Sequence, residues 1–363
     1  MSRFLRVAVA GLGRMGKRHA LHFLQSTPRA HLVAAFTPDP AEIAWAKEHL
    51  EPFGVRIYTD YTALIAAETK PFTDEDSVGG LQAMVVATAT TVHAEETIEA
   101  IEAGLHVLCE KPLSTNIEIA AKVVETAQKY PKQKVLCGFS RRFDTSYRDA
   151  KAKVESGAIG NPAIFRSQTC DKLDPSGFFV AYAEFSGGIF VDCNIHDIDL
   201  ALWFFGDETP IKSISAVGVT AVQPDLAKHG DVDNGVGVVE FWGNKIAYFY
   251  SSRMMASGQH DMTEIIGTEG KITVNQNPIG TLVDLWEATG IRKEIPQDYY
   301  GRFREAFITE ANEFTEACLD DKPLKSRLQG ALSALVIGSV LQESLRSGKK
   351  IYFDEKGQRL PEA

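Results

Sequence analysis

Three side chains are the strongest candidates for chemistry: Lys111, Asp192 and His196. Lys111 follows the apolar run 106–109, so it would stand where a strand of a parallel sheet opens onto a ligand cleft. Asp192 and His196 are four residues apart, which would place them on one face of a helix. A histidine titrates near neutral pH. We predict that His196 removes a hydroxyl proton while Lys111 stabilises the negative charge on the same oxygen.

Each of these residues also has a purely structural interpretation. Lys111 would form a surface ion pair with Glu110, Asp192 would cap a helix, and His196 would be a hydrogen-bonded core histidine. A metal site built from Asp192, His196 and Asp199 is not predicted, because no further histidine or cysteine stands at ligand spacing.

The sequence Gly11-Leu12-Gly13-Arg14-Met15-Gly16 matches G-x-G-x-x-G, between an apolar run and a helical pattern. The first glycine permits a tight turn, the second lets the backbone approach a pyrophosphate, and the third lets helix and strand pack closely. The start of the helix then offers N–H groups to phosphate. These residues predict dinucleotide binding.

The end of the second expected strand leaves the choice of cofactor open. Thr37 stands where an acidic residue would bind the ribose 2′-hydroxyl, and Asp39 follows two residues later. Arg14 would attract the 2′-phosphate of NADP. We expect NAD, with NADP as the alternative.

Six short apolar runs alternate with helical patterns in the first part of the chain. Strands that are apolar on both faces are typical of a parallel sheet covered on two sides. Right-handed crossovers then predict a doubly wound Rossmann domain, over residues 1–137. The expected strands are 5–10, 32–36, 56–58, 81–87, 106–109 and 135–138, and the expected helices are 15–26, 41–50, 61–67, 95–103 and 116–130.

The pattern changes after about residue 138. Consecutive strands without intervening helices predict an α+β domain, residues 138–363, with a large, open, mostly antiparallel sheet. A glycine-bounded turn at 267–270 predicts a hairpin. The expected strands are 163–168, 211–222, 235–241, 245–251, 262–266, 271–274 and 282–287, and the expected helices are 145–156, 302–319 and 328–347.

Composition narrows the class of protein. The chain has 363 residues, 44% of them hydrophobic, and a net charge of −10. It can therefore bury a full core, and an acidic surface argues against a nucleic-acid partner. The sequence contains neither a signal peptide nor an apolar run of about 18 residues, so we expect no membrane contact. Five scattered cysteines with no CxxC pair indicate a reducing, cytoplasmic location.

Taken together, these motifs resemble the glucose–fructose oxidoreductase / inositol dehydrogenase / rhizopine-catabolism (Gfo/Idh/MocA) family over nearly the whole chain. The segment 138–144, GFSRRFD, is similar to that of inositol 2-dehydrogenases in particular. One departure is Thr37, where many members have aspartate. The resemblance rests on 11–16, 88–93, Glu110-Lys111-Pro112, 138–144, the block 187–197 and the hairpin 267–270.

The resemblance implies roles for particular residues. Lys111 would be the catalytic lysine, and Asp192 and His196 would complete the proton-handling triad. The cofactor would be bound by Gly11, Gly13, Arg14, Met15, Gly16, Thr37, Asp39, Thr88, His93, Glu110 and Lys111. The substrate would be bound by Lys111, Arg141, Asp192, Asn194 and His196. Copies of the chain would associate through the second sheet as a homodimer or homotetramer.

The predicted activity is reversible oxidation of a secondary alcohol on a cyclic polyol or sugar. Hydride passes to nicotinamide, and the reaction draws on both domains. Two alternatives stay open. One is an NADP-linked aldose or dihydrodiol dehydrogenase, and the other is a non-catalytic regulator that senses the cofactor on the same fold.

Overall fold

The computed structural model describes residues 4–71 and 80–361, which divide into two compact units. The first is Met1–Ser140 with Glu305–Leu332, and the second is Arg141–Arg304 with Ser333–Ala363. The expected division into 1–137 and 138–363 differs in one main respect, because the segment 305–332 returns to the first unit. Phe307, for example, packs its ring 6.0 Å from that of His19. A helical pattern shows which face is apolar, but not which sheet or helix covers it.

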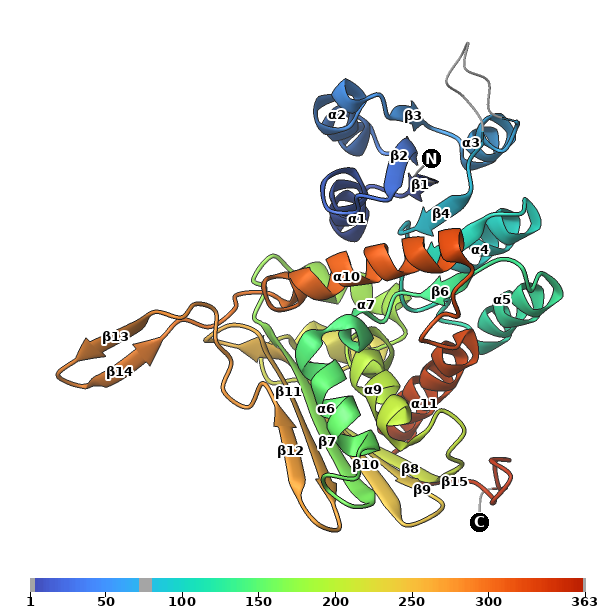
Figure 1. Ribbon diagram of the computed structural model, residues 1–363. Helices are drawn as coiled ribbons and strands as arrows, with labels where there is room; N and C mark the ends of the chain where they lie inside the picture. Colours follow the sequence, from blue (N-terminus) through green and yellow to red (C-terminus); the bar gives the residue numbers. More distant parts are fainter. Residues whose placement is uncertain (1–3, 72–79, 362–363) are drawn as a thin grey trace. The chain divides into compact units, whose positions relative to one another are not determined.

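The first unit contains a six-stranded sheet in the order β3-β2-β1-β4-β5-β6, and every pair is parallel (Figure 1). This is the strand order of a Rossmann fold, in which the order reverses beside β1. The expected doubly wound domain is confirmed. The strands are β1 (Leu5–Ala10), β2 (Ala30–Phe36), β3 (Arg56–Tyr58), β4 (Ala83–Val86), β5 (His106–Cys109) and β6 (Val135–Cys137).

Three helices of the first unit begin at a polar side chain that caps them. Asp39, Asp60 and Asn116 each accept backbone N–H groups at a helix start. The helices are α1 (Arg14–Gln25), α2 (Pro40–His49), α3 (Tyr61–Glu68), α4 (His93–Glu102) and α5 (Ile117–Lys129), with a short 3-10 turn η1 (Glu51–Phe53).

The second unit contains a seven-stranded sheet in the order β12-β11-β7-β10-β9-β8-β15. All pairs are antiparallel except β10 with β7, so the expected mostly antiparallel sheet is confirmed. The predicted hairpin closes where Gly267 N–H donates to Gly270. The strands are β7 (Pro162–Lys172), β8 (Ile211–Val219), β9 (Asn234–Phe241), β10 (Lys245–Met255), β11 (His260–Gly267), β12 (Lys271–Val274) and β15 (Ile351–Tyr352).

Helices of the second unit include the segment that carries Asp192 and His196. The expected helix 145–156 is observed as α6, which is capped by Asp144. The helices are α6 (Thr145–Glu155), α7 (Phe178–Ser186), α8 (Ile189–Asp192) and α9 (Ile195–Phe205), with 3-10 turns η2 (Ser140–Phe143) and η3 (Pro224–His229).

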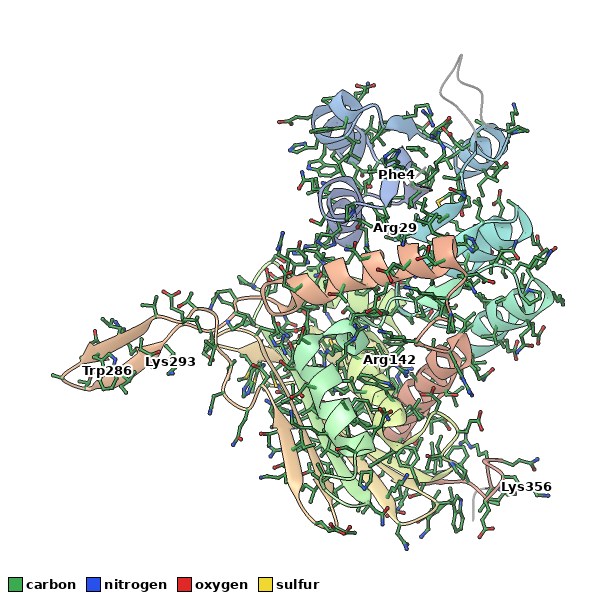
Figure 2. The ribbon with its side chains drawn as sticks, in the orientation of Figure 1. Phe4, Arg29, Arg142, Trp286, Lys293 and Lys356 are labelled. Atoms are coloured by element: carbon green, nitrogen blue, oxygen red, sulfur yellow. The ribbon has the colours of Figure 1, made fainter. Side chains whose placement is uncertain are left out.

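A separate hairpin, β13 (Asp284–Glu287) with β14 (Gly290–Lys293), extends away from the seven-stranded sheet (Figures 1 and 2). The sequence predicted its first strand but not its second. The second has four residues in the sequence Gly-Ile-Arg-Lys, too short to show an alternating pattern. All eight residues are exposed, and Trp286 presents 75% of its surface.

Two long helices, α10 (Tyr299–Asp320) and α11 (Leu328–Ser347), lie near the end of the chain. Within the part that the structure describes, α11 is the one helix whose length and apolarity would suit a membrane span. More than half of that apolar stretch is buried inside the protein. Burial explains the apolar composition of α11, because helices in the core of a protein can be equally long and apolar.

Candidate active site

The glycine loop joins β1 to α1 and has the close packing that its motif requires. Gly11 adopts φ +82°, and a Cβ there would lie 2.6 Å from the backbone of Ala87 and Thr88. A Cβ on Gly16 would lie 1.8 Å from the carbonyl oxygen of Gly11. By contrast, a Cβ on Gly13 would meet only a side-chain oxygen of Glu42, at 3.5 Å. The loop is therefore tight toward the sheet and open at Gly13, which fits a bound pyrophosphate.

Arg14 and Met15 form the first turn of α1, where backbone N–H groups face away from the helix. Arg14 is exposed at this end. Such a turn favours an anion, and no acidic residue stands in it. Both residues stand at the expected helix start, and their contact with phosphate stays a prediction.

The end of β2 is held by a carboxylate that the sequence did not single out. Thr37 is fully buried and donates to Glu42 Oε2 at 2.5 Å, and the same oxygen accepts the Leu12 N–H at 3.1 Å. Asp39 Oδ1 accepts the N–H groups of Ala41 and Glu42 as the cap of α2, and its contact with a cofactor stays a prediction. The Glu42 signal was its place in the first turn of α2, but helix patterning does not show that its side chain bends back to the loop.

Glu110 and Lys111 follow β5, at the carboxyl edge of the parallel sheet. Glu110 is buried, and its Oε1 lies 2.7 Å from Nε2 of His19 on α1. Burial alone would raise the pKa of Glu110, but the His19 hydrogen bond and the nearby Lys111 ammonium outweigh it and lower that pKa. A buried anion is therefore stable beside Lys111, which is itself partly exposed. His19 was not anticipated from the sequence, since the pattern of α1 indicated only an amphipathic helix.

His93 and Thr88 support the loop that carries Lys111. His93 is buried, with Nδ1 3.0 Å from the Pro112 carbonyl oxygen and Nε2 3.1 Å from the Thr88 carbonyl oxygen. Burial lowers the pKa of His93, so the neutral ring donates to one of these carbonyls at a time. Thr88 also donates to Glu96, whose pKa burial raises to about 7. His93 thus links the turns after β4 and β5.

The helix carrying Asp192 and His196 is interrupted between them, which corrects the sequence interpretation. Asp192 ends α8, Cys193 and Asn194 form a turn, and His196 is the second residue of α9. The four-residue spacing therefore does not place the two side chains on one continuous helix face. Both side chains remain partly exposed, whereas Cys193 and Asn194 are buried. Two glycines before α8, Gly187 and Gly188, adopt φ +79° and +91°, which other residues rarely adopt, and so set the direction of this short helix.

Asp192 is positioned by a buried arginine on β10. Arg253 donates to Asp192 at 2.8 Å and to Asp231 at 3.2 Å, and only 1% of its side chain is exposed. Asp231 also accepts the N–H of Ile189, the first residue of α8. The same carboxylate therefore holds both the start of α8 and the arginine that binds its end. The sequence offered no sign of this pair, because Arg253 lies about 60 residues downstream in a strand.

A second carboxyl group, that of Asp171 at the end of β7, lies close enough to Asp192 for the charge of Asp192 to raise its pKa. Burial raises the pKa of Asp171, and the negative charge of Asp192 raises it further. Gln259 donates to Asp171 at 2.7 Å and also to Asp261. Asp192 therefore stands in a polar group that contains a further acidic side chain.

The structure places Arg141 and Asn194 in a buried network around Asp197. Arg141 donates to Asp197 at 2.8 Å and to Asp261 at 3.1 Å, and Asn194 donates to Asp197 at 2.8 Å. Burial raises the pKa of Asp261 to about 6. Both predicted substrate contacts thus hold the start of α9, which carries His196; their direct contact with substrate stays a prediction.

Arg142 and Asp144 each form an ion pair with a different residue. Arg142, labelled in Figure 2, donates two hydrogen bonds to the Asp199 carboxylate, at 2.8 and 2.7 Å. Asp144 accepts from Arg302 at 2.7 Å while capping α6. The carboxylate of Asp199, considered above as a metal ligand, therefore forms an ion pair with Arg142.

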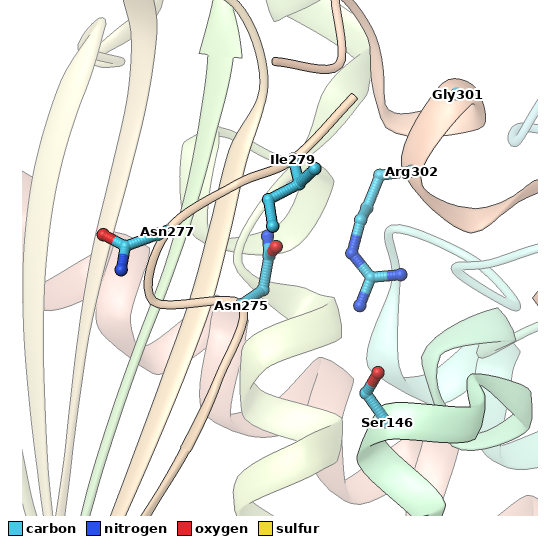
Figure 3. Close-up of a pocket in the computed structure, with 6 residues that line it drawn as sticks. All are labelled: Ser146, Asn275, Asn277, Ile279, Gly301 and Arg302. Carbon is cyan, nitrogen blue, oxygen red and sulfur yellow. The ribbon is translucent and has the colours of Figure 1, made fainter. Parts of the chain in front are cut away.

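An open hollow of about 350 Å³ lies elsewhere in the second unit (Figure 3). Arg302 extends into it toward Ser146, and Asn275 faces them (Figure 3). Its lining is Ser146, Asn275, Asn277, Ile279, Gly301 and Arg302, which includes none of the predicted site residues. Across residues 4–71 and 80–361, no group of three or more His, Cys, Asp or Glu side chains is arranged to hold a metal ion.

Two family models match this chain. The NAD-binding Rossmann domain of the GFO/IDH/MocA oxidoreductases covers residues 5–139, and the C-terminal domain of that family covers residues 147–273. The chain belongs to the Gfo/Idh/MocA oxidoreductase family. It is therefore an oxidoreductase with an NAD-binding domain, as its motifs predicted.

Relatives in this family match the chain end to end. A scyllo-inositol 2-dehydrogenase (NAD(+)) of Bacillus subtilis is 33% identical, with 98% of each chain covered. A myo-inositol 2-dehydrogenase of Thermotoga maritima is 30% identical, covering 97% of this chain and 99% of the relative. The solved scyllo-inositol dehydrogenase of Lactobacillus casei with bound NAD(H) and scyllo-inositol superposes with a TM-score of 0.88 at 30% identity, covering 96% and 99%.

Proposed function

We propose that this Gfo/Idh/MocA protein is an NAD-dependent inositol dehydrogenase that reversibly oxidises one ring hydroxyl of a cyclic polyol. The observation that carries the proposal is the end-to-end similarity to inositol dehydrogenases, one of which holds NAD(H) and scyllo-inositol. The positions of Lys111, Asp192 and His196 agree with it. Each is partly exposed and stands at the end or start of a well-packed element.

Three side chains of this chain would handle the reacting hydroxyl. His196 accepts its proton as general base, and Lys111 donates a hydrogen bond to the oxygen as negative charge develops. Asp192, fixed by Arg253, positions the imidazole or a neighbouring hydroxyl. NAD, when bound, supplies the hydride acceptor.

The cofactor residues of this proposal all lie in the first unit. The loop residues Gly11, Gly13, Arg14, Met15 and Gly16 would hold the pyrophosphate. Glu110 and Lys111 would lie on the nicotinamide side, supported by His93 and Thr88.

We further propose a homodimer or homotetramer in the cytoplasm. Apolar side chains on the seven-stranded sheet are exposed, with Val217 on β8 directly opposite Val236 on β9. Exposed apolar patches of this kind favour association. None of the five cysteines is in a disulfide, which suits a reducing compartment.

The experiment that tests the function is a screen of inositols, other cyclic polyols and sugars with both NAD and NADP. The measured signal is the absorbance of the reduced nicotinamide. The expected result is reduction of NAD with one or more inositols. Reduction of NADP with aldoses or dihydrodiols alone would favour the first alternative. Cofactor binding with no turnover of any substrate would favour the regulator.

A further inference from the structure

A carboxylate from α2 reaches back to the glycine loop. Glu42 Oε2 accepts the backbone N–H of Leu12, inside the G-x-G-x-x-G motif, at 3.1 Å. Its other oxygen, Oε1, lies 3.5 Å from the position that a Cβ of Gly13 would occupy. One side chain of α2 therefore borders the open part of the loop, although 30 residues separate Glu42 from Leu12.

The end of β2 is built to hold that carboxylate. Thr37, which replaces the expected acidic residue, donates its hydroxyl proton to Glu42 Oε2 at 2.5 Å. The Thr37 oxygen in turn accepts the N–H of Asp39 at 3.2 Å. The hydroxyl therefore accepts from Asp39 and donates to Glu42. A threonine here thus fixes a negative charge instead of supplying one.

The other acidic candidate, Asp39, caps α2. Asp39 Oδ1 accepts the N–H groups of Ala41 and Glu42, at 2.8 and 3.0 Å, and so starts α2. This capping also orients the first turn of α2, from which Glu42 projects. Asp39 is exposed, whereas Glu42 is partly buried against the loop.

We propose that Glu42 is the specificity residue that makes this cofactor site select NAD over NADP, in place of an acidic residue at the end of β2. A carboxylate beside the glycine loop accepts a hydrogen bond from an unmodified ribose 2′-hydroxyl and repels a 2′-phosphate. Arg14, at the start of α1, supplies the opposing attraction for phosphate. Glu42 outweighs it because two hydrogen-bond donors hold its carboxylate at the loop.

The test is direct titration of the substrate-free, full-length protein with NAD and NADP, which measures both dissociation constants. Glu42→Gln keeps the size of the side chain and an acceptor for Leu12 and Thr37, but removes the charge. We expect it to weaken NAD binding and strengthen NADP binding. The dissociation constant for NADP divided by that for NAD should then fall at least about tenfold. The matched control is Glu48→Gln, which removes an exposed charge from the same helix and should leave the ratio unchanged.

An unchanged ratio in Glu42→Gln would overturn the proposal. A shift in Asp39→Asn alongside it would assign the selectivity to Asp39. If Glu42→Gln were to fold poorly, Glu42→Asp serves instead, since it keeps the charge but shortens its reach and should weaken NAD binding. Binding to the free protein needs neither polyol nor turnover, so failure here is distinguishable from failure of the proposed polyol oxidation.

Discussion

The imidazole of His19 lies 2.7 Å from the carboxylate of Glu110, Nε2 to Oε1, and both side chains are buried in the first unit. The pair connects the first helix after the glycine loop with the residue preceding Lys111. The position of the Lys111 backbone is further linked to Glu110, whose Oε2 accepts the Lys111 N–H at 3.2 Å. Disturbing His19 should therefore affect both stability and the cofactor site.

We predict that His19→Leu lowers the free energy of unfolding at pH 7 by about 2–3 kcal/mol, because it leaves the Glu110 carboxylate without its buried donor. The pKa of Glu110 is lowered in the folded protein, so its contribution is present above the unfolded pKa and is lost as pH falls through the folded one. In His19→Leu this acid-side loss should disappear. Urea unfolding between pH 4 and 8 measures the effect, and His19→Gln, which retains an N–H donor, is the matched control.

Glu310 on α10 should give the free energy of unfolding the opposite dependence on pH. Its carboxyl group is fully buried, and neither oxygen has a hydrogen-bond partner in the described structure. Burial, and then the charge of Glu110, hold the pKa of Glu310 well above its ordinary value. The unfolded chain ionises first as pH rises, so the folded state loses about 1.4 kcal/mol per pH unit between the two pKa values.

Glu310→Gln should therefore be more stable than the parent protein near pH 8, and the difference should shrink toward pH 4. Unfolding free energies across this range provide the measurement. Glu316→Gln, at a partly exposed site on the same helix, should show no such trend. A difference that stays constant with pH would contradict a protonated Glu310.

Lys111 is expected to stabilise the reacting oxygen, so Lys111→Ala should lower kcat by about 10²–10³-fold with a smaller change in KM. The measurement is steady-state turnover with the polyol identified in the screen. Lys122→Ala, on the exposed face of α5, should behave like the parent protein. An unchanged kcat in Lys111→Ala would remove Lys111 from the mechanism.

His196 is expected to act as general base, so His196→Asn should lower kcat by about 10²–10⁴-fold and flatten the rise of rate with pH near neutrality. The loss of rate follows because no other group then accepts the hydroxyl proton. The pH profile of kcat/KM provides the measurement. A profile with the same inflection as the parent protein would show that a different group titrates.

Arg253 is expected to position Asp192 without touching substrate. Arg253→Met removes the cation from two carboxylates and leaves Asp231 buried without it, which should cost about 3–5 kcal/mol of unfolding free energy. Chemical denaturation measures this cost. Arg253→Lys keeps the charge but not the forked geometry, and should recover part of the stability and less of the turnover.

Much of the first unit was predictable because its signals are local. The strand Leu5–Ala10, the glycine motif and the start of α1 are adjacent in the chain, and five of the six residues of that strand are buried. The order of motifs through Glu110, Lys111 and the segment 187–197 also indicated the family. Local spacing failed at Asp192 and His196, since the turn at Cys193 and Asn194 separates α8 from α9.

The sequence by itself determined the Rossmann sheet, the glycine loop and the residue types available for proton transfer, because strand periodicity and turn chemistry depend on neighbours in the chain. Only the tertiary structure decided which distant groups hold them: Glu42 against the loop, His19 against Glu110, and Arg253 against Asp192. A charged side chain in a helix or strand has the same local pattern whether it faces water or a buried partner. Its partner is chosen by packing, and packing depends on residues tens of positions away.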